Sequence, residues 1–528
     1  MANVSGRDVS GRDGGGRLRR STAIFSLWTG VSRILGLVRE IVAAALFGTQ
    51  GAINAFVIAF QVPNLLRSLV ADSALSAAFG PVYTELQEKG RHRDAQRLVG
   101  AMVGLIGMGL GAITLVAIIA APWFMPFFAP GLPDDLVDEA VRLSRLMFPI
   151  VVLLGLTGLA MAVLQAHGTF GPTAFVPVLW NGIIIASLAV VAPFLPDDQQ
   201  ITVYAVGILL GTVAQLLFLV PYVREIGRFR PALRLGPHVK RVVILMLPVT
   251  VGLGLINVNL SVDAIFATLV DDQAPRAIDA AFRLYLLPQG VFSVAVATVL
   301  FPTISRLAAR DDVDGVRDTV AKGLRHIFFV LLPASALLMV LAEPIVRLVF
   351  QWGAFDAEST ELTSEALLAF SLGLVFNGAS LLIIRAFFSL QQPWRPTAVA
   401  ALGVVLNVVL DALLYPPLGI AGIPLATSIV SLVTFLVLLW MLARELGGIE
   451  GEWVLDGFLR SFMASAAFAL LAWSTWTVLV DALGRGLLGQ VVAVGGGAAA
   501  GALAYIAAAQ AFEMPELRSV ARLRRPLR

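Results

Sequence analysis

Charged residues interrupt the apolar stretch from Ser32 to Leu86, which is long enough for two membrane crossings joined by a tight turn. The charges within it are Arg33, Arg39, Glu40, Arg67 and Asp72. A charged side chain at mid-bilayer depth costs between ~2.5 and more than 10 kcal/mol when it faces lipid, so we expect these groups to face a protein interior or a wet cavity. Because guanidinium groups bind phosphate and pyrophosphate through paired hydrogen bonds, a cavity lined by arginines implies an anionic cargo.

The spacing of the arginines limits how they can act together. Arg33 and Arg39 are six positions apart, about 120° around an α-helix, so both can reach a wide cavity although they share no narrow face. Arg67 follows Pro63, which is expected to kink its helix. Arg283 lies in a later segment that repeats this region. The alternative interpretation is structural: the arginines extend to the lipid headgroups or pair with nearby acids.

A second set of polar residues is rich in oxygen ligands. Asn407 and Asp411 are four positions apart and therefore share one face of a helix. Asp263 lies in the segment INVNLSVDAIF, and Thr427 follows Pro424, which removes a backbone donor and loosens nearby carbonyls. Carboxylate, amide and hydroxyl oxygens without His or Cys suit a hard cation such as Na⁺. The alternative is hydrogen bonding between helices, worth about 0.6–2 kcal/mol per contact in membranes.

The elements that must hold these residues are transmembrane helices. Hydrophobic residues make up 58% of the 528-residue chain and charged residues 14%, whereas soluble domains carry roughly 25% charged residues. Cysteine is absent, which excludes disulfides, thiolate metal sites and a Cys nucleophile. At these lengths only helices satisfy the backbone in hydrocarbon. We predict an all-α polytopic membrane protein with about fourteen crossings, over residues 22–47, 53–87, 95–128, 137–166, 172–195, 200–224, 239–270, 276–307, 317–342, 360–390, 396–417, 420–444, 456–481 and 487–512.

The loops predict the orientation of these helices. Arginine and lysine gather after the second, sixth, eighth, tenth and twelfth crossings, including Arg306, Arg310, Arg317, Lys322 and Arg325, whereas intervening loops such as PGLPDDLVDE are acidic or neutral. The positive-inside rule then places both termini in the cytoplasm. Residues 1–21 lack the apolar core and cleavage site of a secretory signal, so we expect a disordered cytoplasmic tail there and a basic cytoplasmic tail at 513–528.

An internal repeat divides the chain into two lobes. Residues 53–63 read INAFVIAFQVP and residues 278–288 read IDAAFRLYLLP, and each is followed by an apolar helix and a basic loop. We therefore predict two related six-helix lobes, 22–225 and 239–444, with two helices appended at 456–512. Parallel repeats are a common frame for alternating access around a central site, so the architecture indicates a transporter.

Several of these segments resemble the MurJ (MviN) family of lipid II flippases, within the superfamily of multidrug, oligosaccharidyl-lipid and polysaccharide exporters. The resemblance rests on SRILGLVRE, NAFVIAFQVPNLLR, ADSALSAAFGPVYTE and FRLYLLPQGVFSVAVATVLFPTIS, and it extends to about residue 444. It implies transport of undecaprenyl-pyrophosphate-linked disaccharide-pentapeptide from the inner to the outer leaflet of the bacterial inner membrane. Membrane lipids and cell-wall synthesis proteins are further implied partners, whereas nucleic acid, a catalytic activity and a required cofactor are not expected. The residues that it places in the substrate site are Arg33, Arg39, Arg67, Arg283, Asn54 and Asp72.

The resemblance also bears on the cation and on the lipid tail. It implies a sodium site made by Asp263, Asn407, Asp411 and Thr427 with the carbonyl of Ile423, so that sodium or the membrane potential drives transport. It implies that the two appended helices border a groove for the polyprenyl tail. Two positions depart from the pattern, since Asn54 and Leu286 stand where many or some relatives have an acid. The predicted cavity is therefore more cationic than in those relatives.

Three other functions are weighed against this one. A related exporter of drugs or of another polyprenyl-linked oligosaccharide is the nearest alternative, although a carrier of cationic drugs needs acids in its cavity. A polyprenyl-phosphate transferase needs an acidic cluster for Mg²⁺, and DDVD at 311–314 is its nearest candidate, which we interpret as a solvated loop. A scaffold for cell-wall enzymes has no need of buried arginines.

Overall fold

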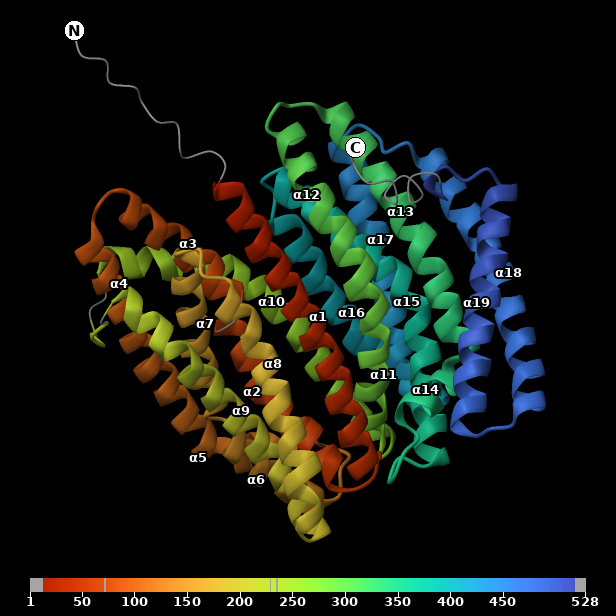
Figure 1. Cartoon of the computed structure of the whole chain (residues 1–528), viewed down its shortest axis with the longest axis horizontal. Helices are drawn as coiled ribbons and strands as arrows, with labels where there is room; N and C mark the ends of the chain where they lie inside the picture. Colours follow the sequence, from red (N-terminus) through yellow and green to blue (C-terminus); the bar gives the residue numbers. More distant parts are fainter. Residues whose placement is uncertain (1–12, 71–72, 228, 234–235, 518–528) are drawn as a thin grey trace. The chain divides into compact units, whose positions relative to one another are not determined.

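The chain is built from α-helices joined by short loops, as a computed structural model shows (Figure 1). The structure describes residues 13–70, 73–227, 229–233 and 236–517. No β-strand occurs among these residues, which confirms the predicted all-helical fold class. The contacts divide the chain into two compact units: unit 1 holds residues 1–43, 58–127 and 134–257, and unit 2 holds residues 44–57, 128–133 and 258–528.

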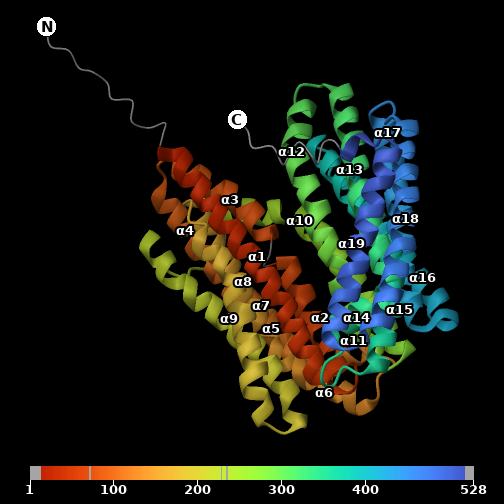
Figure 2. The same cartoon turned by 45° about the vertical axis from the view of Figure 1, so that its right-hand side comes forward.

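Unit 1 holds the N-terminal helices. Its core forms where α3, α4 and α7 meet, with Phe79, Tyr83, Leu98, Met102 and Val163 all buried. Burial of such side chains contributes roughly 1.5–3 kcal/mol each. The unit contains most of α1 (Asp13–Phe47) and α2 (Ala52–Val70), then α3 (Ser73–Glu88), α4 (His92–Leu105), α5 (Gly111–Phe128), α6 (Asp134–Met147), α7 (Ile150–Ala166), α8 (Gly171–Ala186), α9 (Asp197–Ile226) and the first part of α10 (Pro237–Val270), as Figure 2 shows.

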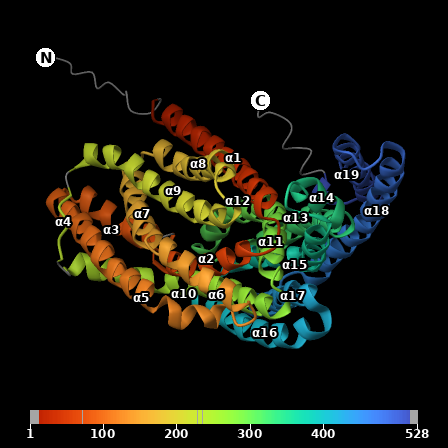
Figure 3. The same ribbon diagram turned by 90° about the horizontal axis from the view of Figure 1, so that it is seen from below.

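Unit 2 holds the C-terminal helices. After the second part of α10 come α11 (Ala274–Pro288), α12 (Val294–Ala308), α13 (Val313–Val340), α14 (Ala342–Phe350), α15 (Ala357–Ser389), α16 (Trp394–Leu418), α17 (Gly422–Glu445), α18 (Gly451–Leu483) and α19 (Leu487–Ala511). The last two helices pack closely against each other, and α18 also packs on α13 (Figure 3). Two of these helices begin at aspartates: Asp312 and Asp356 accept the backbone N–H of Gly315 and Ser359 at 2.9 and 2.8 Å. Such caps satisfy donors that the first turn of a helix leaves unpaired.

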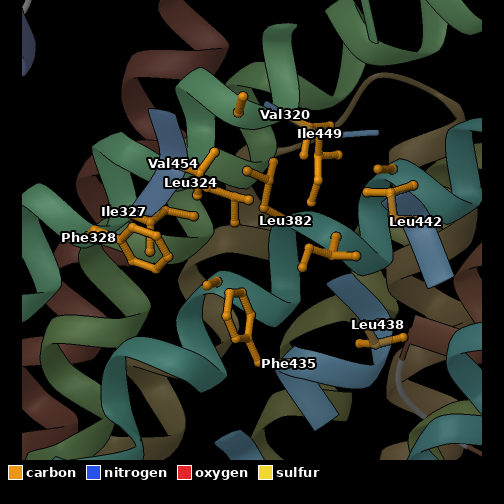
Figure 4. Packing of buried hydrophobic residues seen from close by; sticks show 14 of the residues in the cluster. Val320, Leu324, Ile327, Phe328, Leu382, Phe435, Leu438, Leu442, Ile449 and Val454 are labelled. Atoms are coloured by element: carbon orange, nitrogen blue, oxygen red, sulfur yellow. The ribbon is translucent and has the colours of Figure 1, made fainter. Parts of the chain in front are cut away.

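The core of unit 2 is an apolar cluster where α13, α15 and α17 meet (Figure 4). Its side chains recur at helical spacing, as in Val320, Leu324 and Ile327 of α13, so one face of each helix enters the cluster. Phe328 and Phe435 meet edge to face with their ring centroids 6.1 Å apart. The cluster joins helices that are distant in sequence into one body.

Two short segments from the N-terminal half belong to unit 2. The backbone N–H of Ala354 donates to the carbonyl of Ala45 at 2.8 Å, and Gly48 and Gly353 both have positive φ. A Cβ on either glycine would collide with the backbone carbonyl opposite, so only glycine permits this approach. Gly131 similarly lies against Thr268 and donates its N–H to the threonine hydroxyl at 3.3 Å. Residues 44–57 and 128–133 are thus built into the second body.

The described helices include many that are long and apolar enough to cross a membrane, as predicted. Ten stretches are long and apolar enough to cross a membrane; one of them, Trp394–Glu445, contains both α16 and α17, and two shorter apolar helices are Ala52–Leu66 and Asn257–Val270. The count of fourteen crossings stays a prediction. Some bounds differ from those expected: α1 begins at Asp13, within the segment expected to be a tail, and units 1 and 2 divide within α10. The segment 53–87, which was expected to form one crossing, contains two helices, α2 and α3.

Candidate functional site

Arg33 lies on α1 as an exposed guanidinium in an otherwise apolar run. The side chains of Ile34 and Val38 beside it are also exposed, and among the described residues Arg33 has no hydrogen-bond or ion-pair partner. A side chain of this kind is unusual in a membrane helix unless a ligand, water or headgroup meets its charge. The structure therefore leaves Arg33 available to an anion.

Arg39 lies one and a half turns later on α1 but has a different environment. It is 8% exposed, and its Nε and Nη2 atoms donate to Oε1 of Glu40 at 3.1 and 2.6 Å. The guanidinium carbon also lies 4.8 Å from the ring centroid of Trp180 on α8. The pairing with Glu40 is the structural alternative considered for this residue, since its charge is neutralised within unit 1.

Two predicted substrate residues cannot be placed in the same detail. Arg67 belongs to α2, four positions after Pro63 in that helix, and its side chain lies outside the described part of the structure. Asp72 lies outside the described residues altogether. Their roles stay predictions.

Arg283 on α11 is held by an aspartate that the sequence analysis did not single out. Its Nε and Nη2 atoms donate to the two carboxylate oxygens of Asp279 at 2.9 and 3.2 Å, while the side chain remains 34% exposed. The buried Arg276 donates to the same carboxylate at 3.1 Å. One acid thus orients two arginines, and its spacing of four residues from Arg283 is the signal that could have revealed it.

Asn54 makes all its recorded side-chain hydrogen bonds to the backbone. It is fully buried, its amide group donates to the carbonyls of Thr49 and Gly51 at 2.6 and 3.4 Å, and its oxygen accepts the N–H of Arg276 at 2.9 Å. Arg276 lies in the first turn of α11, so Asn54 caps that helix from a distant segment. The Asn54 side chain is therefore occupied by backbone groups in this structure, and its role in cargo binding stays a prediction.

The predicted cation ligands come together within unit 2. The Asn407 amide on α16 donates to Asp263 Oδ1 on α10 at 2.5 Å and to Asp411 Oδ2 at 2.8 Å. The hydroxyl of Thr427 on α17 donates to Asp263 Oδ2 at 3.0 Å. Asp263, Asn407 and Asp411 are buried, whereas Thr427 is partly exposed. We refer to these four residues as the aspartate cluster.

The aspartate cluster has oxygen atoms to spare. Asn407 Oδ1 and Asp411 Oδ1 are buried and have no hydrogen-bond partner among the described residues. No arginine or lysine of the described chain pairs with either carboxylate, and the two carboxylates repel each other when both are ionised. Ile423 is buried one turn before Thr427 on α17, which places its carbonyl on the same side of the helix. The donor set fits a hard cation.

The acidic run DDVD at 311–314 has a structural explanation. Asp312 caps α13 through Gly315, and Asp314 pairs with Arg317 at 2.9 Å. The first of the four, Asp311, has a positive φ of 54° in the turn before that helix. Asp311 and Asp312 therefore precede α13, and Val313 and Asp314 begin that helix, so only the first half of the run lies in a loop.

Known proteins resemble this chain over most of its length. The family model described as lipid II flippase MurJ matches residues 43–493. The chain is 32% identical over 476 residues to the lipid II flippase MurJ of Burkholderia cenocepacia, covering 88% of this chain and 90% of that protein. It is 31% identical over 425 residues to a probable lipid II flippase MurJ of Vibrio cholerae, covering 78% and 80%.

Solved structures show the same fold. A lipid II flippase MurJ in an inward closed conformation superposes with a TM-score of 0.77 at 23% identity, covering 93% of this chain and 98% of that chain. Multidrug resistance transporters of the MATE family match in an inward-facing form, with a TM-score of 0.69 at 15% identity over 79% of this chain and 94% of that chain. They also match in an outward-facing form, with a TM-score of 0.58 at 14% identity over 81% and 95%.

Proposed function

Because the chain belongs to the MurJ family of lipid II flippases, we propose that it moves lipid II from the cytoplasmic to the outer leaflet of the bacterial inner membrane. The observation that carries the proposal is the family match over residues 43–493, which includes Arg283 and the whole aspartate cluster. The relatives named as lipid II flippases also match this chain over most of their own length. The cargo is the undecaprenyl-pyrophosphate-linked disaccharide-pentapeptide, and no covalent bond changes during its transport.

The arginines bind the pyrophosphate in this proposal. Arg33 supports it because its guanidinium is exposed on an apolar helix and has no protein partner among the described residues. Arg283 supports it because Asp279 fixes the guanidinium while a third of the side chain stays accessible. A pre-oriented arginine loses less conformational entropy when it binds a phosphate oxygen. Arg39, already paired with Glu40, contributes less directly unless that pair opens during transport.

The transport step is alternating access. The chain forms two compact units, and transporters with the same fold are known in inward-facing and outward-facing forms. A carrier of this kind exposes its arginines first to one side of the membrane and then to the other. Both termini lie in the cytoplasm, as the basic loops predict.

Sodium resets the carrier at the aspartate cluster. Asp263, Asp411, Asn407 and Thr427 supply the side-chain oxygens and Ile423 its carbonyl, and the two oxygens without a hydrogen-bond partner fit this assignment. A bound Na⁺ supplies the positive charge that two buried carboxylates need. Because the ligands come from α10, α16 and α17, filling the site favours the conformation of unit 2 in which these helices lie together.

Flipping by the purified protein tests the proposal. In liposomes that contain fluorescent lipid II, we expect wild-type protein to expose the lipid to an external quencher, and Arg33→Ala and Arg283→Ala to reduce the rate at least tenfold. Arg310→Ala is the matched control, because Arg310 is an exposed arginine in the turn after α12. Rescue of a flippase-depleted bacterial strain should follow the same order.

The alternatives predict other results. Transport of cationic drugs without lipid II exposure favours the exporter alternative. Flipping of a different polyprenyl-linked oligosaccharide in preference to lipid II changes the cargo but keeps the mechanism. Unchanged rates in both arginine variants contradict the role given to these residues.

A further inference from the structure

Unit 1 contains a cavity that the transport proposal does not use. It has a volume of about 560 Å³, within the ~300–1,000 Å³ typical of ligand sites. The helices α4, α7 and α9 form its walls, with side chains that are almost all aliphatic. The wall residues include Val99 and Val103 of α4, Leu156 and Ala160 of α7, and Leu216 and Val220 of α9.

The cavity lies at one end of these three helices. Its lining residues belong to the second half of α4, to the middle and last turns of α7, and to the last turns of α9. The loops before α4 and after α9 are basic. From Arg224 to Leu216 the cavity extends eight residues along α9, about 12 Å. One leaflet of the hydrocarbon core is about 15 Å deep, so the cavity has the depth of a single leaflet.

A segment of the loop after α9 closes the end of the cavity. The N–H of Ala232 donates to the carbonyl of Gly100 at 3.0 Å, and Gly100 and Gly104 of α4 leave room for the carbonyls of Arg230 and Ala232. A side chain at either glycine would collide with this segment, so the contact depends on both. Phe229, held in place by this contact, lines the cavity.

Among the described residues, Arg224 is the one charged side chain in the cavity lining. It lies in the last turn of α9, is exposed, and has no hydrogen-bond or ion-pair partner among the described residues. The next residue, Glu225, is about 100° further around the helix and does not line the cavity. The exposed Arg230 of the closing segment adds to the positive charge nearby. An apolar cavity with a guanidinium at its mouth is complementary to a chain with an anionic head.

We propose that this cavity binds an acyl chain of an anionic membrane phospholipid, with the lipid phosphate on Arg224. The chain enters sideways from the leaflet on the side of the basic loops, because Phe229 and the closing segment cover the end. The cargo lipid is a poorer match, since an undecaprenyl chain is far longer than the depth of one leaflet. None of the predicted substrate arginines is among the described lining residues, and the inference does not depend on the transport proposal.

Lipid binding to the purified full-length protein tests this inference. Native mass spectrometry in detergent should show tighter binding of phosphatidylglycerol than of phosphatidylcholine with the same chains. Arg224→Gln should weaken phosphatidylglycerol binding about tenfold and remove the preference, because one charge-assisted phosphate contact is lost. Arg93→Gln, which changes an exposed arginine of α4 outside the cavity, should behave as wild type.

A second measurement locates the chain. A phosphatidylglycerol with a photoreactive group in its acyl chain should label peptides of α4, α7 and α9, and Ala160→Trp, which fills the cavity, should abolish that labelling. Equal affinity of wild type and Arg224→Gln, or labelling that Ala160→Trp leaves unchanged, overturns the proposal. Stronger competition by undecaprenyl pyrophosphate than by phosphatidylglycerol also overturns it, because the occupant is then the cargo lipid.

Discussion

Two sites in unit 2 that contain buried carboxylates balance the negative charge in different ways. In the first, Arg325 of α13 donates to Glu516 and to the carbonyl of Trp453, at 2.7 Å from the latter, and lies 3.5 Å from Asp456. Its guanidinium carbon is 4.2 Å from the ring centroid of Trp453. In the second, the aspartate cluster, no cationic side chain of the described chain is present.

The two sites differ in the source of the positive charge: at one it belongs to the protein, and at the other it must come from solution. The positive charge of Arg325 is covalently part of α13, and in this structure it joins that helix to α18 and to the segment after α19. The aspartate cluster needs a charge from outside, and a proton or a cation can leave again. A buried acid pair without its own cation is thus suited to a conformational switch, whereas one with an arginine is suited to a fixed joint.

The largest effect is expected where the charge is permanent. Arg325→Met should destabilise the protein by about 3–5 kcal/mol, because it leaves Glu516 buried without its cation. Thermal unfolding in detergent measures this, with Arg310→Met as the exposed control. Adding Glu516→Gln to Arg325→Met should recover part of the loss. A small effect of Arg325→Met would mean that the joint does not stabilise the described fold.

The next largest effect concerns the removable charge. Wild-type protein should unfold at a higher temperature in sodium than in choline, since a ligand at 100 times its Kd stabilises by about 2.7 kcal/mol. Asp411→Asn should abolish this difference without lowering the unfolding temperature in choline, because one of two repelling charges is removed. Asp138→Asn, at an exposed acid of α6, is the control. A sodium effect that persists in Asp411→Asn refutes the cation assignment.

Asn54, a buried side chain without charge, is expected to give an effect of intermediate size on stability. Asn54→Asp keeps the acceptor for the Arg276 N–H but loses the donor to the Thr49 carbonyl. We expect a loss of about 1–3 kcal/mol, the cost of an unsatisfied buried polar group. Chemical denaturation compared with Asn54→Ala, which loses both bonds, measures the two contributions. Equal stability of Asn54→Asp and wild type would show that the donor is not needed.

The smallest effect is expected for a carboxylate close to solvent. The backbone N–H of Ser359 holds the pKa of Asp356 below its ordinary value, so this cap stabilises the folded state above the unfolded pKa of about 3.9 and loses its effect as the pH falls through the folded value. Asp356→Ala should cost about 1 kcal/mol at neutral pH. The difference in unfolding temperature between wild type and variant should shrink below about pH 4. A difference that does not change with pH would contradict a charged cap.

Sequence reasoning located several of these residues but not their partners. The aspartate cluster was predicted from oxygen-rich residue types, and the structure joins Asp263 to Asn407 although they are 144 positions apart. Arg325 was counted among the basic residues of a loop, but it is 2% exposed and paired with Glu516, 191 positions away. Asp279 escaped notice, although it lies one turn before Arg283. The sequence around an arginine at the end of an apolar segment does not show whether its charge is solvated by water or paired with a buried acid.

The sequence by itself determined the helical membrane architecture and the residues whose side chains could bind an anion or a cation. Hydropathy and helix length are local properties, so long apolar stretches specify helices without knowledge of their neighbours. The tertiary structure alone decided that Arg325 is neutralised by Glu516, which lies 191 positions away. The pairs Arg39–Glu40 and Arg283–Asp279 lie within single helices, and the structure shows that these local pairs form. Arg33 and Arg224 have no partner among the described residues. The cavity beside Arg224 likewise depends on how α4, α7 and α9 pack. The Arg325–Glu516 pair and this cavity follow from distances between packed elements, which no single segment contains.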